Sequence, residues 1–340
     1  MKKLLLALTV IVAATSSCDN EIRVEEQENK PEIVTDTPIE FSIFADKGTR
    51  AQETNLEAYH KTFAVYGTKD NHGMQTVFDK VTVTYEAGAT APNEWTYSPL
   101  RYWDKQGSYE FIAFAPESAP MAYTLSAEGK VTGGKFATTG KYTLIGQNIQ
   151  DGTSGEEKYV GFVGGTDKDT DIMLSDKATA DGALKHTVNL NFHHILAKLN
   201  VAVKTVSGFT SDIIVKNITI TGLDDTGEYT DAAGWASSSV DAGYKLQYDD
   251  ATGVELSDKA TYFIESLVMP QEMDGKLTLV YEIKSGGYTE TYTYVVDIED
   301  VYSSTYTSFD KESNYTITFT IDPTNDAIKF DSNVAEWEEK

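Results

Sequence analysis

The sequence has little cysteine, proline or positive charge. Its 340 residues include 1 Cys, 8 Pro and 28 Lys+Arg against 53 Asp+Glu, for a formal net charge of -25. A single cysteine excludes a disulfide framework and a cysteine-rich metal site. A negative charge of this size repels nucleic acid and anionic membrane surfaces, so we expect neither as a partner.

Long apolar runs are also scarce, and the run at residues 4–14 is typical of an export signal. It follows a basic start and precedes a few small residues, which is the order of a secretory signal. The run is too short to span a membrane as a helix. Cys18 follows directly and resembles the lipidated residue of a bacterial lipobox. We predict a lipoprotein signal over residues 1–18 with Cys18 as anchor; the alternative is an ordinary cysteine in a removed peptide.

The stretch that follows, residues 19–37, is polar and acidic and shows no apolar period. Such a segment cannot bury enough apolar surface to fold, so we predict a flexible tether.

The rest of the chain is rich in segments where apolar and polar residues alternate. Short alternating runs separated by Gly, Asn and Asp favour β-sandwiches. At about 150 residues per domain, we predict an all-β fold of two tandem β-sandwich domains with few short helices, over residues 38–187 and 188–340. We also expect a long loop over 149–187 and single helical turns within 193–200 and 300–310. Residues 109–115 alternate less cleanly, because Ile112 and Phe114 are also apolar, which is typical of a strand buried on both faces. The clearest runs are 39–43, 81–85, 188–192, 199–203, 277–281, 292–296 and 315–321.

The residues that could carry chemistry form no recognisable constellation. None of the 5 histidines lies in an HExxH pair. His193 and His194 follow each other in an apolar run, so their rings should point to opposite faces, one of them into a core or interface. Residues 167–171 resemble the start of a calcium loop, but Ile172 stands where the turn glycine is needed. We predict no catalytic residue, metal site or cofactor, and therefore a protein that is not an enzyme.

Aromatic residues suggest a different kind of site. Trp235 lies in a stretch rich in Gly, Ala and Ser, which makes it the best candidate for an exposed ligand contact, such as a sugar platform. The other interpretation is packing between sheets.

Several patches, taken in order along the chain, resemble the fimbrillin family, the subunits of lipoprotein-derived pili in Gram-negative gut and oral bacteria. The most specific is 190–199 (LNFHHILAKL), which follows 171–174 (DIML). The others are residues 39–42 with 49–51, then 63–67, 95–97, 101–103, 109–116 and 328–337.

The resemblance implies two transthyretin-like sandwiches and an assembly mechanism. An arginine-specific surface protease would cut between Arg50 and Ala51, in the loop after the first strand. That strand, with Ile39, Phe41 and Ile43 as its inward residues, would leave the N-terminal domain. A C-terminal donor strand from a neighbouring subunit would replace it by β-augmentation. Its inward residues would be Ile328, Phe330 and Val334, with the small polar Ser332 interrupting the row.

The resemblance also implies the partners and the location. The partners would be other fimbrial subunits, of the same or another kind, the protease, and the outer membrane through the lipid before processing. The protein would belong to a fimbrium at the cell surface and support adhesion. Alternatives stay open at three points. Arg50 could be an unprocessed surface arginine, the C-terminal segment could be a last strand of its own domain, and the chain could be a glycan-binding surface lipoprotein.

Overall fold

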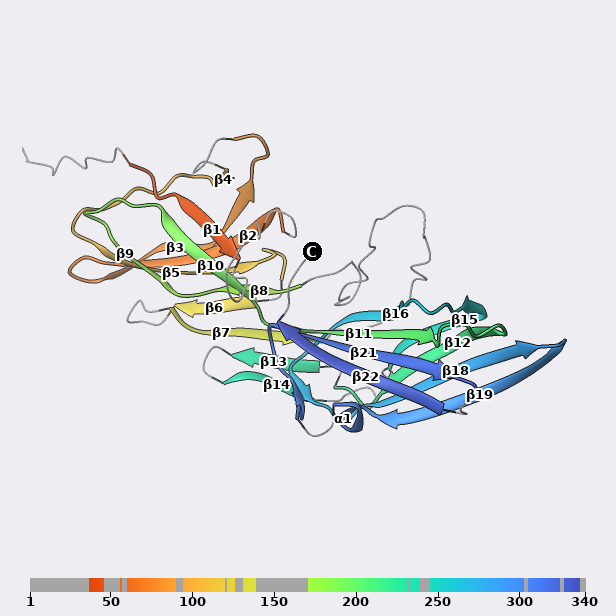
Figure 1. The fold of residues 1–340 in the computed structure, drawn as a ribbon. Helices are drawn as coiled ribbons and strands as arrows, with labels where there is room; N and C mark the ends of the chain where they lie inside the picture. The colour runs from red at the N-terminus through yellow and green to blue at the C-terminus, as the bar shows by residue number, and fades with distance from the viewer. Residues whose placement is uncertain are drawn as a thin grey trace, which may run out of the picture. The chain divides into compact units, whose positions relative to one another are not determined.

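The computed structural model describes residues 37–45, 56, 60–89, 94–119, 121–125, 131–138, 171–224, 226–230, 233–238, 245–302, 305–324 and 327–336. Strands dominate these ranges, and the helical element among them is α1 (Ile298–Val301) (Figure 1). The predicted all-β fold is confirmed. Within the same ranges, no helix is long and apolar enough to cross a membrane.

The first sheet has eight strands, ordered β1-β10-β8-β5-β2-β3-β4, with β9 also paired to β5. Its core-facing side is rich in aromatic rings, because Phe, Tyr and Trp occupy alternate positions of several strands. β5 is buried on both faces from residue 111 onwards, as expected from its apolar residues 111–115: Phe111 and Phe114 are each 0% exposed. The strands are β1 (Phe41–Ala45), β2 (Thr62–Asp70), β3 (Met74–Tyr85), β4 (Trp95–Thr96), β5 (Ser108–Ala115), β8 (Met173–Ser175), β9 (Ala178–Asp181) and β10 (Val188–His194).

Two four-stranded sheets, β16-β11-β21-β22 and β15-β12-β18-β19, enclose a second core. This core is mainly aliphatic, and Leu199, Val201, Ile218 and Leu279 are all fully buried in it. The strands are β11 (Ala197–Thr205), β12 (Asp212–Thr221), β15 (Lys245–Glu255), β16 (Thr261–Val268), β18 (Lys276–Ser285), β19 (Tyr288–Asp297), β21 (Ser313–Asp322) and β22 (Ala327–Glu336).

The remaining described strands form two smaller sheets. One has the order β14-β13-β7-β6, and the other pairs β17 with β20. β7 hydrogen-bonds to β13, which joins segments from both sides of the predicted division at residue 187. The division into two domains stays a prediction, and the place of β10 in the first sheet favours a boundary after His194. The strands are β6 (Met121–Leu125), β7 (Val131–Thr138), β13 (Thr226–Thr230), β14 (Gly234–Ser238), β17 (Gln271–Glu272) and β20 (Ser308–Phe309).

Two local expectations were wrong. Residues 193–200 form no helical turn: β10 ends at His194, β11 begins at Ala197, and the connecting Ile195 and Leu196 are buried. Burial on both faces makes a strand apolar at every position, which imitates helical spacing. The expected loop over 149–187 contains β8 and β9, while its part before residue 171 lies outside the described residues.

The helical turn expected within 300–310 corresponds to α1, which begins two residues before that range, at Ile298.

Candidate functional site

The first strand supplies the central ring of the aromatic core. Ile39, which lies two residues before β1 begins, and Phe41 are 0% exposed, and Ile43 is partly buried. The apolar residues of this strand share one face because side chains alternate along it. The Phe41 ring lies among four others, with centroid distances of 6.1 Å to Phe63, 5.4 Å to Phe78, 5.8 Å to Tyr97 and 5.9 Å to Phe111.

Backbone contacts hold the segment on both sides. β1 runs parallel to β10, from Phe41 opposite Val188 to Ala45 opposite Phe192, and Figure 1 shows the two strands side by side. On the other side, the Ile39 amide donates to the Arg101 carbonyl at 2.8 Å, and the Trp103 amide donates to the Thr37 carbonyl at 3.2 Å. Residues 37–45 therefore bridge β10 and the segment that follows β4.

Tyr97 fastens the start of this segment through its hydroxyl. The hydroxyl donates to the Ile39 carbonyl at 2.7 Å and accepts from the Arg101 amide at 3.2 Å. Burial raises the pKa of Tyr97 to about 12, outweighing the opposing effect of Arg101, so the group stays a protonated donor at neutral pH. The contact between Tyr97 and Ile39 could not be expected from the sequence, because it spans 58 positions of the chain.

The predicted lipidation and cleavage residues lie outside the described ranges. These are Cys18, Arg50 and Ala51, whose roles stay predictions. The chain is described up to Ala45 and again at Leu56, which is 0% exposed in the first core.

The C-terminal strand packs on its own sheet in this structure. β22 pairs with β21 from Asp322–Ala327 to Ser313–Glu336 without a register shift. Its inward residues are incompletely covered: Phe330 is 38% exposed, and Ile328 and Val334 are only partly buried against the second core. Ser332 donates its hydroxyl to the Val301 carbonyl at 2.9 Å, which accounts for a polar residue in the row. The donor role stays a prediction.

Trp235 is half-buried. Its indole N–H donates to the Ile195 carbonyl at 2.5 Å, and its ring packs edge-on against Tyr229 at a centroid distance of 5.6 Å. Through these contacts the Trp235 side chain stabilises the fold. Its role as a ligand contact stays a prediction.

The adjacent histidines occupy opposite faces of β10, as predicted. His194 is buried, and its Nδ1 lies 2.5 Å from Oδ2 of Asp171. His60 is also buried nearby, and burial lowers its pKa despite the opposing influence of Asp171. His60 and His194 are each 7% exposed, and the side chain of Asp171 is 14% exposed, so the cluster has little contact with solvent.

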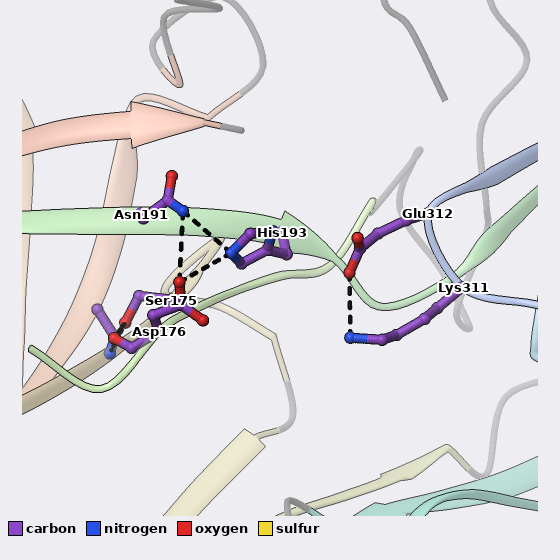
Figure 2. A network of polar contacts seen from close by, with 7 residues as sticks. Ser175, Asp176, Asn191, His193, Lys311 and Glu312 are labelled. Atoms are coloured by element: carbon purple, nitrogen blue, oxygen red, sulfur yellow. Dashed lines mark hydrogen bonds and ion pairs between the residues drawn. The ribbon is translucent and has the colours of Figure 1, made fainter. Parts of the chain in front are cut away.

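His193, on the other face, belongs to a surface network that Figure 2 shows. Its Nε2 lies 3.0 Å from Oδ2 of Asp176 and 3.1 Å from Nδ2 of Asn191. Partial burial acts to raise the pKa of Asp176, but hydrogen bonds from His193 and Asn191 and the charge of Lys311 outweigh it and lower the pKa. Ser175 does not complete a triad, because its hydroxyl accepts from the Ala113 amide and donates to the Asp176 carbonyl.

Across the described ranges, no group of three His, Cys, Asp or Glu side chains is arranged to hold a metal ion. The hydrogen bonds and ring contacts described above hold neighbouring strands together and fill the cores.

The fold is similar to those of solved surface proteins from Bacteroides. A fimbrial protein from Bacteroides vulgatus is 17% identical, with a TM-score of 0.57 over 89% of this chain and 100% of that chain. A candidate cell adhesion protein from Bacteroides ovatus is 15% identical, with a TM-score of 0.52 over 89% of this chain and 98% of that chain. At these identities the likeness concerns the fold alone. No match is found among curated proteins. The family model of fimbrillin-like proteins, however, matches residues 49–337, and the chain therefore belongs to the fimbrillin-like family.

Proposed function

We propose that this protein is a structural subunit of a cell-surface fimbria and supports adhesion. Membership of the fimbrillin-like family is the main support, and the shared fold with a fimbrial protein and a candidate adhesion protein agrees with it. A structural role rather than a catalytic one fits this family.

The subunit assembles by strand exchange after its first strand is removed. The observation that carries this proposal is the position of residues 37–45. They fill the middle of the aromatic core with Phe41, yet their ladder to β10 spans only the five residues of β1. Losing them would expose the rings around Phe41 and leave backbone groups of β10 and Arg101 unpaired. Unpaired edge groups and exposed apolar surface both favour binding of a replacement strand.

The replacement is β22 of a neighbouring subunit. Ile328, Phe330 and Ser332 have the same two-residue spacing as Ile39, Phe41 and Ile43. In this register Phe330 takes the central position, and Ser332 takes that of Ile43, which is only partly buried and needs no large side chain. Val334 continues the row. Alternate side chains entering alternate pockets is how an added strand gains specificity.

Cleavage between Arg50 and Ala51 would release the first strand, and Cys18 would hold the precursor at the outer membrane through its lipid. The matched family region begins at residue 49, so β1 precedes it. The cleavage position lies between β1 and Leu56, where a cut separates the strand from the rest of the first sheet.

N-terminal sequencing of chains taken from assembled fimbriae tests the cleavage step. We expect the chains to begin at Ala51, and we expect Arg50→Ala to prevent cleavage and assembly. Lys47→Ala, a change in the same segment, is the matched control and should be processed normally. Fimbrial chains that still begin at Cys18 would overturn the cleavage step.

A second experiment tests the donor strand. Phe330→Asp should abolish filaments while the secreted subunit stays folded, because the half-exposed ring contributes little to its own domain. Lys329→Asp changes an exposed neighbour on the opposite face and should leave filaments intact. Normal filaments from Phe330→Asp would exclude β22 as the donor in this register.

A further inference from the structure

The outer edge of β19 is long, regular and almost free of charge. β19 ends its four-stranded sheet, and its ten residues, Tyr288–Asp297, pair with β18 without a register shift (Figure 1). Among the described strands, none pairs with its other edge. Between Thr289 and Val296 the only charged residue is Glu290. Such an edge is a template for pairing with another chain.

The other edge strands of this sandwich carry features that discourage pairing. β15 has a register shift, adjacent acidic residues Asp249 and Asp250, and Gly253 at a φ of 75°. β16 also has a register shift where it pairs with β11. β22 exposes Lys329 and Asp331. Bulges and charges are common means of protecting sheet edges, and β19 has neither over most of its length.

Exposed apolar side chains accompany this unprotected edge. Tyr288 is 80% exposed and Val295 is 52% exposed. Tyr288 directly follows the turn of the β18–β19 hairpin, where Gly286 and Gly287 have φ angles of 58° and 86°. Positive φ at both residues is typical of a tight type I′ turn, which holds the start of β19 in register.

We propose that β19 pairs antiparallel with β19 of a second copy of this chain, around a two-fold axis at Tyr292. This register opposes no like charges, whereas a two-fold axis at Glu290 would place two carboxylates directly opposite each other. The pairs are aromatic or β-branched, apart from Glu290, which meets a tyrosine. They are Tyr288 with Val296, Thr289 with Val295, Glu290 with Tyr294, and Thr291 with Thr293.

A second copy suits this edge for two further reasons. Pairing around the two-fold axis extends the sheet and covers the partly buried row Tyr292, Tyr294 and Val296. With a net charge of -25, two copies repel each other over most of their surface, and this strand offers a self-complementary stretch with little charge. The contact closes after two chains, so it is separate from strand exchange, which uses β22 and propagates.

Disulfide trapping tests the register. The variants Thr291→Cys and Thr293→Cys are made separately in the full chain, purified in detergent and oxidised alone or as a mixture. Opposed residues on adjacent strands lie within disulfide reach, so we expect a dimer linked through 291 and 293 in the mixture only. Mass spectrometry separates this bond from any at Cys18. Equal trapping in single variants, or none in the mixture, would overturn the proposal.

Sedimentation equilibrium tests whether the edge drives association. We expect Thr293→Lys to weaken the wild-type dimer at least ~10-fold, since a lysine on the edge opposes strand pairing. Thr252→Lys, at an exposed position of β15, should have no effect. Added salt should strengthen the dimer by screening repulsion. A wild-type chain that stays monomeric in high salt, or a dimer insensitive to Thr293→Lys, would exclude the proposal.

Discussion

The two large cores of this chain are completed in different ways. The first is aromatic, and its central ring, Phe41, comes from a short strand that pairs in parallel with β10, almost 150 positions away. The second is mainly aliphatic, and its strands all lie between Ala197 and Glu336. The first core thus depends on a segment that a single cut could separate from it. The second depends on no such segment but leaves β19 and β22 at its sheet edges.

Under the proposed strand exchange, this difference would let one chain be stable as a precursor and still assemble. A core closed by a short, remote strand is complete only while that strand is attached. A core closed by local strands stays complete and can present an edge strand to a neighbour. If this contrast holds, variants in and around β1 should lose more stability than matched variants in β22.

The largest effect is expected from truncating the two phenylalanines. Phe41→Ala should lower the free energy of unfolding by about 3–5 kcal/mol, because it opens a cavity among four rings. Phe330→Ala should lower the free energy of unfolding by only about 1–2 kcal/mol, since the Phe330 ring is 38% exposed. Urea unfolding of the full chain, followed by Trp fluorescence, measures both. Equal costs would remove the proposed contrast.

A smaller effect is expected at the hydroxyl that fastens the first strand. Tyr97→Phe should lower the free energy of unfolding by about 1–2 kcal/mol, because the Ile39 carbonyl and the Arg101 amide lose their hydrogen bonds to the Tyr97 hydroxyl. Tyr102→Phe, on an exposed ring beside the same segment, is the control and should change stability by less than about 0.5 kcal/mol. Limited proteolysis near residue 45 should accelerate in Tyr97→Phe alone. No difference between the variants would contradict a fastening role.

The smallest effect at neutral pH concerns the buried His60. Because burial lowers its pKa below the ordinary 6.5, the unfolded chain binds more protons just below that pH. The stability associated with neutral His60 is therefore complete above pH 6.5 and is lost as the pH falls from there towards the folded-state pKa.

Unfolding measured across this pH window checks the linkage. His60→Gln should flatten the pH dependence, with Asp171 and His194 as the other titratable groups of the cluster. His186→Gln, at an exposed histidine, should leave the slope unchanged. An unchanged slope in His60→Gln would show that other groups govern it.

Much of the fold could be predicted because it follows from local patterns. Alternation identified β1, β5, β10, β11, β18, β19 and β21, and the row Ile39, Phe41 and Ile43 indicated the inward face of the first strand. The short strands β8 and β9 went unpredicted, because three or four residues carry too little periodicity. The segment 193–200 was misread since burial on both faces hides alternation.

The candidate site was less predictable than the fold. Inward residues of β1 and β22 follow from spacing, but Tyr97 and Arg101 contact the first strand only through the tertiary fold. Trp235 looked exposed in a stretch of small residues, yet a backbone carbonyl and Tyr229 lie against it. Contacts of this kind depend on chain segments that approach from far away in the sequence.

The sequence by itself determined the all-β character, the acidic surface and which side chains of each strand can face a core, because these depend on composition and on a period of two. Only the tertiary structure decided that the first strand lies between β10 and residues 101–103, that Phe41 sits at the centre of its rings, and that β19 and β22 remain as edges. The physical reason is that backbone hydrogen bonds are the same for every residue pair. Strand order therefore depends on how the whole set of side chains packs.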